Sequence, residues 1–453
     1  MGAMMAKTAT VVWLLGALLS AAILSAQGGP TTLQFSFSNP GARSLGLGGA
    51  FVALADDATA AFANPAGLVQ LTRPEVSIEG RYWSYSTPFT VGGRISGQPT
   101  GIGLDTPLRT SESEFDTSAI SFLSFAYPGR KWTVALYRHQ LAKFEATVAT
   151  QGLFTDDRDD DSFKACLADP DICRFADVIR GTRVDIVTTT ASIAYRLSDT
   201  FSLGAGISFF ESDFSLPAEG YVISDETLPL GFFGPNSYAP EGVFATGLFE
   251  SEDTDWGLNL GLLWFLTRQW SLGAFYRSGP GITMSGEERS GPALDPPIPD
   301  GTIWDLDSAI PLEFPDVYGL GFAYRSKNGF WTVSFEWDRV EYSTILGSIP
   351  PSDLIDTTDT RLDDADELHL GVEYVFLKMS PIVALRVGTW KDPDHQIRSV
   401  EDDLLERALL PGGNDEVHYS IGAGVAFKNL QWDLAVDFSD IVDTASLSLI
   451  WAF

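Results

Sequence analysis

The sequence predicts an all-β protein, a transmembrane antiparallel β-barrel of about 14 strands with an N-terminal hatch that plugs the lumen. Three observations lead to this prediction. Segments of alternating apolar and polar residues fill the chain from residue 75 onward, short and long connections alternate between them, and an export signal begins the chain. We therefore expect a signal peptide at 1–26, a hatch at 27–74 and a barrel at 75–453.

The N-terminal residues are typical of a cleaved signal peptide. Lys7 provides the positive start, Ala9 to Leu24 is apolar, and small residues follow. This stretch is slightly short for a membrane-spanning helix, and no later stretch approaches the roughly 20 apolar residues that such a helix needs. An uncleaved anchor helix is the alternative interpretation.

Residues 331–338 show the strand period clearly, since bulky apolar residues alternate there with polar or acidic ones. This pattern fits a wall with lipid outside and a wet interior. It recurs at 430–438 and at the C-terminus, where an alternating apolar strand ends in Phe453, an ending that barrel-assembly machinery generally recognises. The expected strands centre on 76–85, 118–127, 132–149, 185–197, 201–215, 252–265, 270–279, 315–325, 330–342, 366–376, 381–390, 418–427, 430–438 and 444–453.

The connections favour a barrel over a soluble β-sandwich, which is the alternative. Every second connection is short and polar, at 128–131, 198–200, 267–269, 326–329, 377–380 and 428–429. The others are mostly long, at about 86–117, 150–184, 216–251, 280–314, 343–365 and 391–417, and only 439–443 is brief. Short periplasmic turns and long external loops are the pattern of bacterial outer-membrane barrels. We therefore expect a multi-pass protein of the outer membrane, in contact with its lipid.

Composition and motifs exclude several classes of function. The chain has 29 Lys+Arg against 60 Asp+Glu, a net charge of −31, which argues against a nucleic-acid partner. It contains no HExxH, no G-x-S-x-G and no phosphate loop, and its four histidines show no metal spacing. We therefore expect no enzyme, no cofactor and no metal. The acidic run 155–161 could attract Ca²⁺, but a solvated acidic loop is the better interpretation.

The chain has two cysteines, Cys166 and Cys173. Their spacing in an oxidising compartment predicts one small loop disulfide. Two free thiols are the alternative, although exposed thiols outside the cell tend to oxidise.

Residues from about 30 to 72 do not read as strands. The segment 41–55 is small and apolar, and 56–63 is expected to form a short helix with an aspartate as N-cap. In Asn64-Pro65-Ala66-Gly67, Asn64 can cap a second helical turn that begins at Pro65, and Gly67 is free to bend the chain. Because side chains alone cannot fill a barrel of about 14 strands, this compact segment is suited to plug it.

With these motifs the sequence resembles the FadL-like family of outer-membrane transporters for long-chain fatty acids and other hydrophobic compounds. The resemblance rests on 41–55, 55–60, 64–68, 314–321 and the arm at 270–274. It implies a hatch inside the barrel, passive uptake of hydrophobic molecules, and lateral exit beside a kinked third strand. The expected third strand, 132–149, contains neither glycine nor proline, so the sequence shows no kink.

The expected loop at 216–251 is rich in apolar residues and is predicted to capture hydrophobic cargo. In the resembling family, the loops after the fifth and seventh strands have this role. Two other interpretations remain open: the loop packs down as a lid, or it docks an exported protein, as in barrels that act as secretion-system shuttles. The proposed capture residues are Leu228, Leu230, Phe232, Phe233, Phe244 and Phe249.

Alternation places a set of polar residues in the lumen: Arg81, Asn259, Arg277, Arg325, Glu336, Asp338, Glu367, His369, Glu373, Arg386, Asp433 and Asp437. A fatty acid needs a partner for its carboxylate, and arginine binds carboxylates as a bidentate fork. Arg81, Arg277, Arg325 and Arg386 are the candidates. The alternative for each is an ion pair with a wall acid that holds the hatch. Passage is expected when the hatch around 64–67 rearranges.

Overall fold

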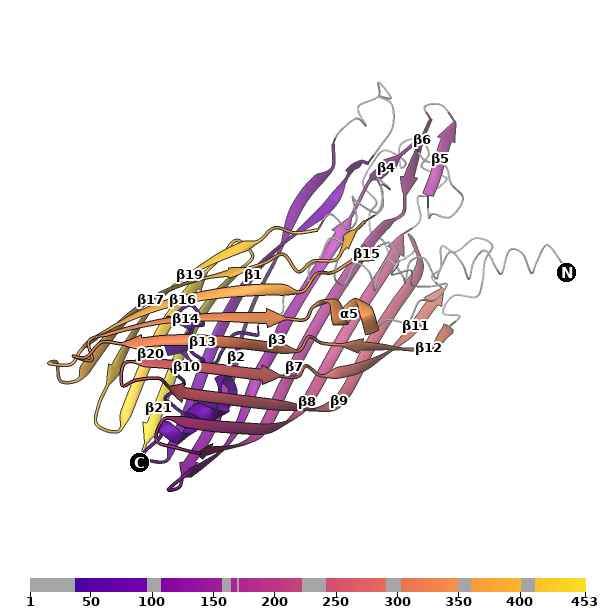
Figure 1. Cartoon of the computed structure of the whole chain (residues 1–453). Helices are drawn as coiled ribbons and strands as arrows, with labels where there is room; N and C mark the ends of the chain where they lie inside the picture. The colour runs from indigo at the N-terminus through magenta and orange to yellow at the C-terminus, as the bar shows by residue number, and fades with distance from the viewer. Residues whose placement is uncertain are drawn as a thin grey trace.

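A single antiparallel sheet closes into a barrel, because its first strand, β1 (Glu75–Arg94), pairs with both the second and the last strand (Figure 1). The computed structural model describes residues 37–95, 107–156, 164–168, 171–221, 242–290, 303–348, 360–400 and 412–453. The expected signal peptide lies outside these residues. No helix within these ranges has the length and apolar character needed to cross a membrane.

The barrel has the predicted 14 strand positions. Two positions consist of two strands in succession, β10 with β11 and β12 with β13. After β1 the order around the wall is β2 (Arg109–Pro128), β3 (Trp132–Thr150), β7 (Asp177–Arg196), β8 (Phe201–Tyr221), β9 (Val243–Phe265), β10 (Trp270–Arg277), β11 (Gly281–Ser290), β12 (Ile303–Glu313), β13 (Val317–Arg325), β14 (Trp331–Val340), β16 (Ala365–Phe376), β17 (Ile382–Asp392), β19 (Glu416–Ala426), β20 (Leu430–Phe438) and β21 (Val442–Ala452).

The smaller elements lie inside the barrel or at its loop end: α2 (Ala42–Leu45), α3 (Ala60–Ala63), the 3₁₀ helix η1 (Pro65–Gln70), α5 (Ser343–Ser348), β4 (Leu153–Thr155), β5 (Lys164–Ala168), β6 (Asp171–Phe175), β15 (Thr360–Arg361) and β18 (Arg398–Ser399). In the small sheet formed by β4, β5 and β6, Cys166 and Cys173 are register partners, and Cys173 is disulfide-bonded.

The two-part strands are interrupted at the same height, where Asp316 joins the two breaks. Its carboxylate accepts hydrogen bonds from the backbone N–H of Gly279, at 3.0 Å, and from the hydroxyl of Tyr276, at 2.5 Å. Gly279 is required there, because a Cβ would lie 2.3 Å from the carbonyl oxygen of Phe314. The motif at 314–321 thus forms a specific joint in the wall.

Short turns occupy one end of the barrel, and the C-terminus lies at that end (Figure 1). The loops at the other end are shorter than predicted, because the strands extend into the ranges expected to be loops. β1 reaches Arg94, β2 begins at Arg109, β7 begins at Asp177, β8 reaches Tyr221 and β9 begins at Val243. The hydrophobic pattern used to find strands does not persist along these extensions.

The reason is a reversal of polarity along the wall. In the part of β8 near the short turns, Leu203 and Ile207 are exposed on the outer face and serines lie inside. Farther along, Glu211 faces outward while Phe210 and Phe214 are buried inside. Side chains still alternate between the inner and the outer face, but the outer face is now acidic and the inner face apolar. This part of the strand therefore lacks the apolar outer face of a lipid-facing strand.

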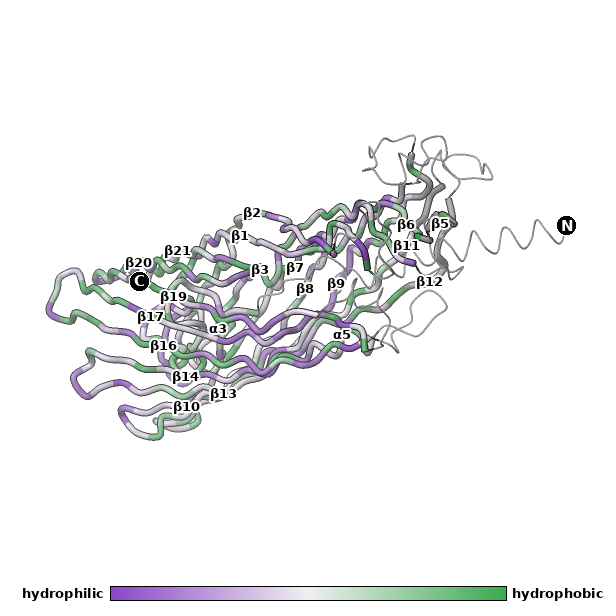
Figure 2. Tube along the Cα trace, turned by 90° about the horizontal axis from the view of Figure 1, so that it is seen from above, coloured by the Kyte–Doolittle hydropathy of each residue, from purple (hydrophilic) through white to green (hydrophobic). Residues whose placement is uncertain are grey.

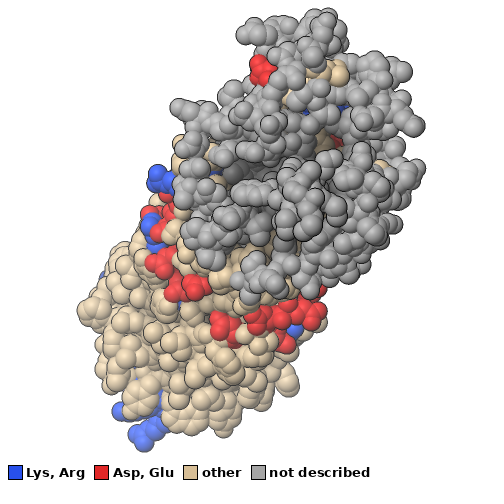
Figure 3. Space-filling model, turned by 90° about the vertical axis from the view of Figure 1, so that its right-hand side faces the viewer, with Lys and Arg blue, Asp and Glu red and all other residues tan. Residues whose placement is uncertain are grey.

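The same reversal occurs on neighbouring strands at a similar height. On β2 the exposed Ile120 is followed outward by exposed Asp116 and Glu114, and on β9 the exposed Trp256 is followed by exposed Glu252. Green and purple alternate along the strands in Figure 2, and Figure 3 shows acidic side chains gathered beyond the largely uncharged surface of the barrel. The lipid-facing band therefore ends at these acids, and the longest strands extend beyond it.

Candidate functional site

Residues 37–72, called the N-terminal segment below, run inside the barrel, and most of their side chains are buried. Small residues on both surfaces permit close contact. A Cβ on wall residue Gly261 would lie 2.2 Å from the side-chain oxygen of Asn64, and a Cβ on Gly204 would lie 2.3 Å from the amide nitrogen of Ala66. Within the segment, Gly67 permits close contact with Ala55, because a Cβ at position 67 would lie 2.2 Å from the carbonyl oxygen of Ala55.

Asn64 fixes the centre of the segment and caps η1 as predicted, with Pro65 at the first helical position. Its side-chain oxygen accepts a hydrogen bond from the N–H of Ala66, at 3.1 Å. Its amide nitrogen donates to the carbonyl oxygens of Val52 and of Leu262 on β9, at 3.0 and 2.9 Å. One side chain thus joins two parts of the N-terminal segment to the wall.

The predicted aspartate N-cap of the first helix is wrong. Helix α3 starts after Thr59, whose side chain makes no capping bond to it. Asp57 instead accepts hydrogen bonds from the N–H and the hydroxyl of Thr59, at 2.9 and 2.5 Å. The aspartate therefore closes a turn just before the helix.

Charged side chains hold the opposite side of the segment. Arg43 pairs with Asp56, at 2.6 Å, and with wall residue Glu373, at 3.2 Å. Glu373 also pairs with Arg386, at 2.7 Å, and Arg325 pairs with Asp56, at 2.7 Å. Two of the four candidate arginines, Arg325 and Arg386, therefore belong to an ion-pair network that holds the segment.

Arg81 is also engaged, since its guanidinium pairs with Glu79 at 2.8 Å. Arg277 differs from the other three candidates, because it has no carboxylate partner among the described residues. Its guanidinium lies over the rings of Phe62 and Phe275, 4.1 and 4.2 Å from their centroids. Its one described hydrogen bond is long, 3.4 Å to Asn39.

Arg277 lines a pocket between the N-terminal segment and the wall, with about 380 Å³ of space that includes open solvent. Most of its other lining groups are apolar or aromatic, including Phe37, Tyr137, Leu141 and Phe210. A cation in an otherwise largely apolar cavity suits a molecule with an acidic head and an apolar body.

Leu141 marks an irregularity in β3 that the sequence does not reveal. In the pairing of β3 with β7 the register shifts between Gln140 and Ala142, so Leu141 forms a bulge without glycine or proline. The pairing of β3 with β2 ends at His139, opposite Phe122. Beyond that point, in the described residues, β3 pairs only with β7, and the wall has a break in its hydrogen-bond ladder.

Phe37 also lines a second cavity, which has about 790 Å³ of empty space that is partly open to solvent. Its lining is more polar and includes Asp338, Glu367, His369 and His418. His418 stacks on Trp390, with ring centroids 3.8 Å apart, and Trp390 also stacks on His369. Apart from lumen-facing alternation, no feature of the sequence indicates this cluster, because its members come from several strands.

The capture-loop prediction concerns residues that the structure largely leaves undescribed. Leu228, Leu230, Phe232 and Phe233 lie outside the described residues, and Phe244 belongs to β9. Phe249 corrects the prediction. It is a strand residue, 2% exposed and part of the interior core, because β9 starts well before the expected end of the loop.

Comparisons with known proteins agree with this architecture. The family model described as "Outer membrane protein transport protein (OMPP1/FadL/TodX)" matches residues 174–445. A search of curated proteins gave no match.

Two solved structures are similar over nearly their whole length. A FadL homologue from Pseudomonas aeruginosa has a TM-score of 0.62 at 15% identity, covering 94% of this chain and 100% of that one. The toluene transporter TodX from Pseudomonas putida has a TM-score of 0.53 at 17% identity, covering 93% of this chain and 100% of that one. At these identities the likeness shows the fold.

Proposed function

This chain belongs to the OMPP1/FadL/TodX family of outer-membrane transport proteins, and we propose that its cargo is a long-chain fatty acid. It is thus a β-barrel transporter of the bacterial outer membrane, of the type that carries hydrophobic compounds. The observation that carries the finer proposal is Arg277, a cation without a described carboxylate partner in a cavity lined mostly by apolar side chains. A fatty acid supplies both the carboxylate and the apolar tail that such a cavity can bind.

The interior of the long strands provides an apolar path toward this cavity. Phe210 lines the cavity, and Phe214, Leu216 and Phe249 continue the buried apolar face toward the loop end. Acidic residues cover the outside of the same strands, so the apolar face is directed inward. We propose that cargo enters along this face, driven by its concentration gradient alone.

We further propose that residues 27–74 act as a hatch and that Asn64, Pro65, Ala66 and Gly67 gate it. The contacts of Asn64 with Val52 and Leu262 support this role, because their loss would free the centre of the segment at once. The wall binds mainly backbone and charged groups of the segment. Water can replace these hydrogen-bond partners while the segment moves.

The break between β2 and β3 supports a lateral exit into the membrane. Leu141, the bulge residue, lines the same cavity as Arg277. Cargo bound at Arg277 therefore lies beside the part of β3 that has no described ladder with β2. A hydrophobic molecule that leaves at the inner end of this break, near exposed Ile120 and below the acids Asp116 and Glu114, passes into lipid without crossing the wet lumen.

Binding of palmitate and hexadecanol to the purified detergent-solubilised barrel tests the cargo. Palmitate has a carboxylate where hexadecanol has a hydroxyl, so the wild type should bind palmitate more tightly. Arg277→Gln should lower the ratio of the two affinities by about 10- to 150-fold, which corresponds to the loss of a hydrogen bond to a charged group. Arg339→Gln is the control, because Arg339 pairs with Asp364 and Asp366 outside this cavity. An unchanged preference in Arg277→Gln, or a barrel that binds neither ligand and carries a stoichiometric exported protein, contradicts the proposal.

Deletion of Leu141 tests the exit. Because Gln140 pairs with Val187 and Ala142 with Ile186, the deletion restores a regular ladder without changing the partners of the other residues. It should slow fatty-acid uptake by cells more than Leu141→Ala does. Both variants remove the Leu141 side chain from the cavity and should bind palmitate equally well. Leu141→Ala keeps the bulge and serves as the control, and equal uptake by the two variants would argue against lateral exit.

A further inference from the structure

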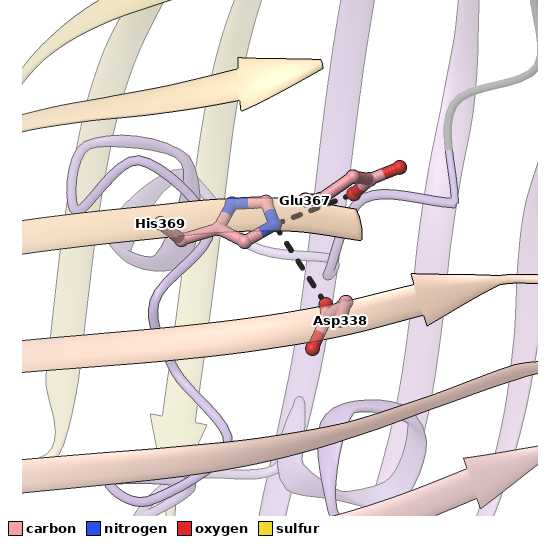
Figure 4. Close-up of side chains that lie close together, drawn as sticks. All are labelled: Asp338, Glu367 and His369. Atoms are coloured by element: carbon pink, nitrogen blue, oxygen red, sulfur yellow. Dashed lines mark ion pairs between the residues drawn. The ribbon is translucent and has the colours of Figure 1, made fainter. Parts of the chain in front are cut away.

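A buried cluster of one histidine and two carboxylates lies in the wall beside the larger cavity (Figure 4). Asp338 belongs to β14, and Glu367 and His369 belong to β16. Their ligand atoms all lie within 4.8 Å of one another. Asp338 and His369 are 5% and 7% exposed, and the side chain of Glu367 is 12% exposed. The register places Asp338 opposite Glu367, which brings the acids together.

The histidine ring is oriented from its far side. Its Nδ1 lies 2.7 Å from the carbonyl oxygen of Gly48, in the N-terminal segment, and must donate to that acceptor. Nε2 is then directed at the two carboxylates. A ring whose Nδ1–H is held by a backbone carbonyl is the usual arrangement of a metal-binding histidine.

Distances within the cluster are longer than those of ordinary direct hydrogen bonds, and the distance to Glu367 matches the spacing of two ligands of one metal ion. Nε2 of His369 lies 3.3 Å from Oε2 of Glu367 and 3.7 Å from Oδ2 of Asp338. Hydrogen bonds between nitrogen and oxygen are usually about 2.7–3.2 Å long. Tetrahedral Zn²⁺ with bonds of about 2.0–2.2 Å instead places neighbouring ligand atoms about 3.3–3.5 Å apart.

Two buried atoms of the cluster also lack hydrogen-bond partners. Within the described part of the chain, Nε2 of His369 and Oδ1 of Asp338 make no hydrogen bond, although both are shielded from solvent. Among the described residues, neither Asp338 nor Glu367 forms an ion pair with a lysine or an arginine. Buried carboxylates normally have such a partner or bind a metal ion.

We propose that Asp338, Glu367 and His369 bind a divalent transition-metal ion, with Zn²⁺ as the best fit to one imidazole and two carboxylates. This goes beyond the transport of hydrophobic cargo, and it does not depend on the identity of that cargo. The metal neutralises the buried acids and fixes His369 against Gly48. It thereby attaches the N-terminal segment to β16, while its remaining coordination positions face the larger cavity.

Metal binding by the purified full-length barrel, stripped with a chelator, is the test. Equilibrium dialysis against Zn²⁺ alone should show one tight equivalent in the wild type, and at least 100-fold weaker binding in His369→Gln and Asp338→Asn. His395→Gln is the matched control, since His395 is also buried beside a carboxylate, Asp392, but is not in the cluster. His395→Gln should still bind one equivalent of Zn²⁺ as tightly as the wild type.

A second readout requires no variant to fold. Co²⁺ added to the stripped wild type should give the visible absorption of a protein-bound ion with a nitrogen ligand, and Zn²⁺ should remove it. The proposal is overturned if the wild type shows neither the Zn²⁺ equivalent nor the Co²⁺ absorption. It is also overturned if folded His369→Gln, verified by its electrophoretic mobility before and after heating, binds Zn²⁺ as tightly as the wild type.

Discussion

Glu336 holds the middle of the N-terminal segment, and its replacement by alanine tests how the segment is anchored. This carboxylate is fully buried, at 0% exposure, on β14. It accepts hydrogen bonds from the backbone N–H groups of Phe51 and Val52, at 2.7 and 2.8 Å, and from the side chain of Asn39, at 3.3 Å. Glu336→Ala leaves the two backbone donors without an acceptor.

The expected effect of Glu336→Ala on local opening of the segment follows from the number and kind of hydrogen bonds that are lost. Hydrogen bonds to a charged group contribute about 1.5–3 kcal/mol each, so two of them contribute about 3–6 kcal/mol to the local anchoring of the segment. Since about 1.4 kcal/mol corresponds to a factor of 10, local opening should become about 10²- to 10⁴-fold more frequent. Glu336→Gln keeps an acceptor oxygen and should fall between alanine and the wild type.

Hydrogen exchange followed by mass spectrometry measures this opening, because the amides of Phe51 and Val52 exchange only when released. Asp366→Ala is the control, since Asp366 lies on the outer face of the neighbouring strand in an exposed pair with Arg339, and such pairs contribute little. Exchange at 51–52 that changes less than tenfold in Glu336→Ala would refute the assigned anchoring role.

Three further predictions concern the same segment and one loop. Gly261→Ala should displace the segment and raise ion conductance in planar bilayers, because its Cβ would lie 2.2 Å from an oxygen of Asn64; Gly80→Ala, with nothing within 4 Å of the new Cβ, should leave conductance unchanged. Asn64→Ala removes two donated bonds and one cap, so its conductance should rise at least as much as that of Gly261→Ala, and a closed channel would count against the hatch. Burial lowers the pKa of His395, but Asp392 and the carbonyl of Pro393 raise it to about 9. Because this value exceeds the unfolded pKa of about 6.5, protonated His395 stabilises the folded protein. This contribution to the free energy of unfolding is complete below pH 6.5 and is lost as the pH rises through 9. An NMR titration of the ring, with His395→Gln to assign its signal, measures this, and a midpoint near 6.5 would show that Asp392 does not hold the proton.

The parts of the fold that the sequence predicted are those with a local signature. Strands facing lipid alternate bulky and polar residues, and Asn64 followed by Pro65 has the chemistry of a capped helical turn. The outer halves of the long strands escaped prediction because their faces exchange polarity at residues such as Phe210 and Glu211. A search for lipid-facing strands therefore reads them as loops.

Features of the site that depend on register were not visible in the sequence. Asp338 and Glu367 meet only because β14 and β16 pair in one particular register. The bulge at Leu141 uses neither glycine nor proline, so no residue type marks it. Likewise, the four lumen arginines look equivalent in sequence, and only their neighbours distinguish Arg277 from the three that are paired.

The way the wall holds the N-terminal segment has a consequence for how such a transporter can diversify. Ser202, Ser271 and Asn259 all donate to main-chain carbonyl oxygens of the segment, not to its side chains. Contacts of this kind are indifferent to which small residue supplies the carbonyl. A side chain that faces a cavity, such as Phe62, takes no part in these bonds. Single substitutions on the interior surface can therefore alter the cargo preference while these bonds to the wall remain.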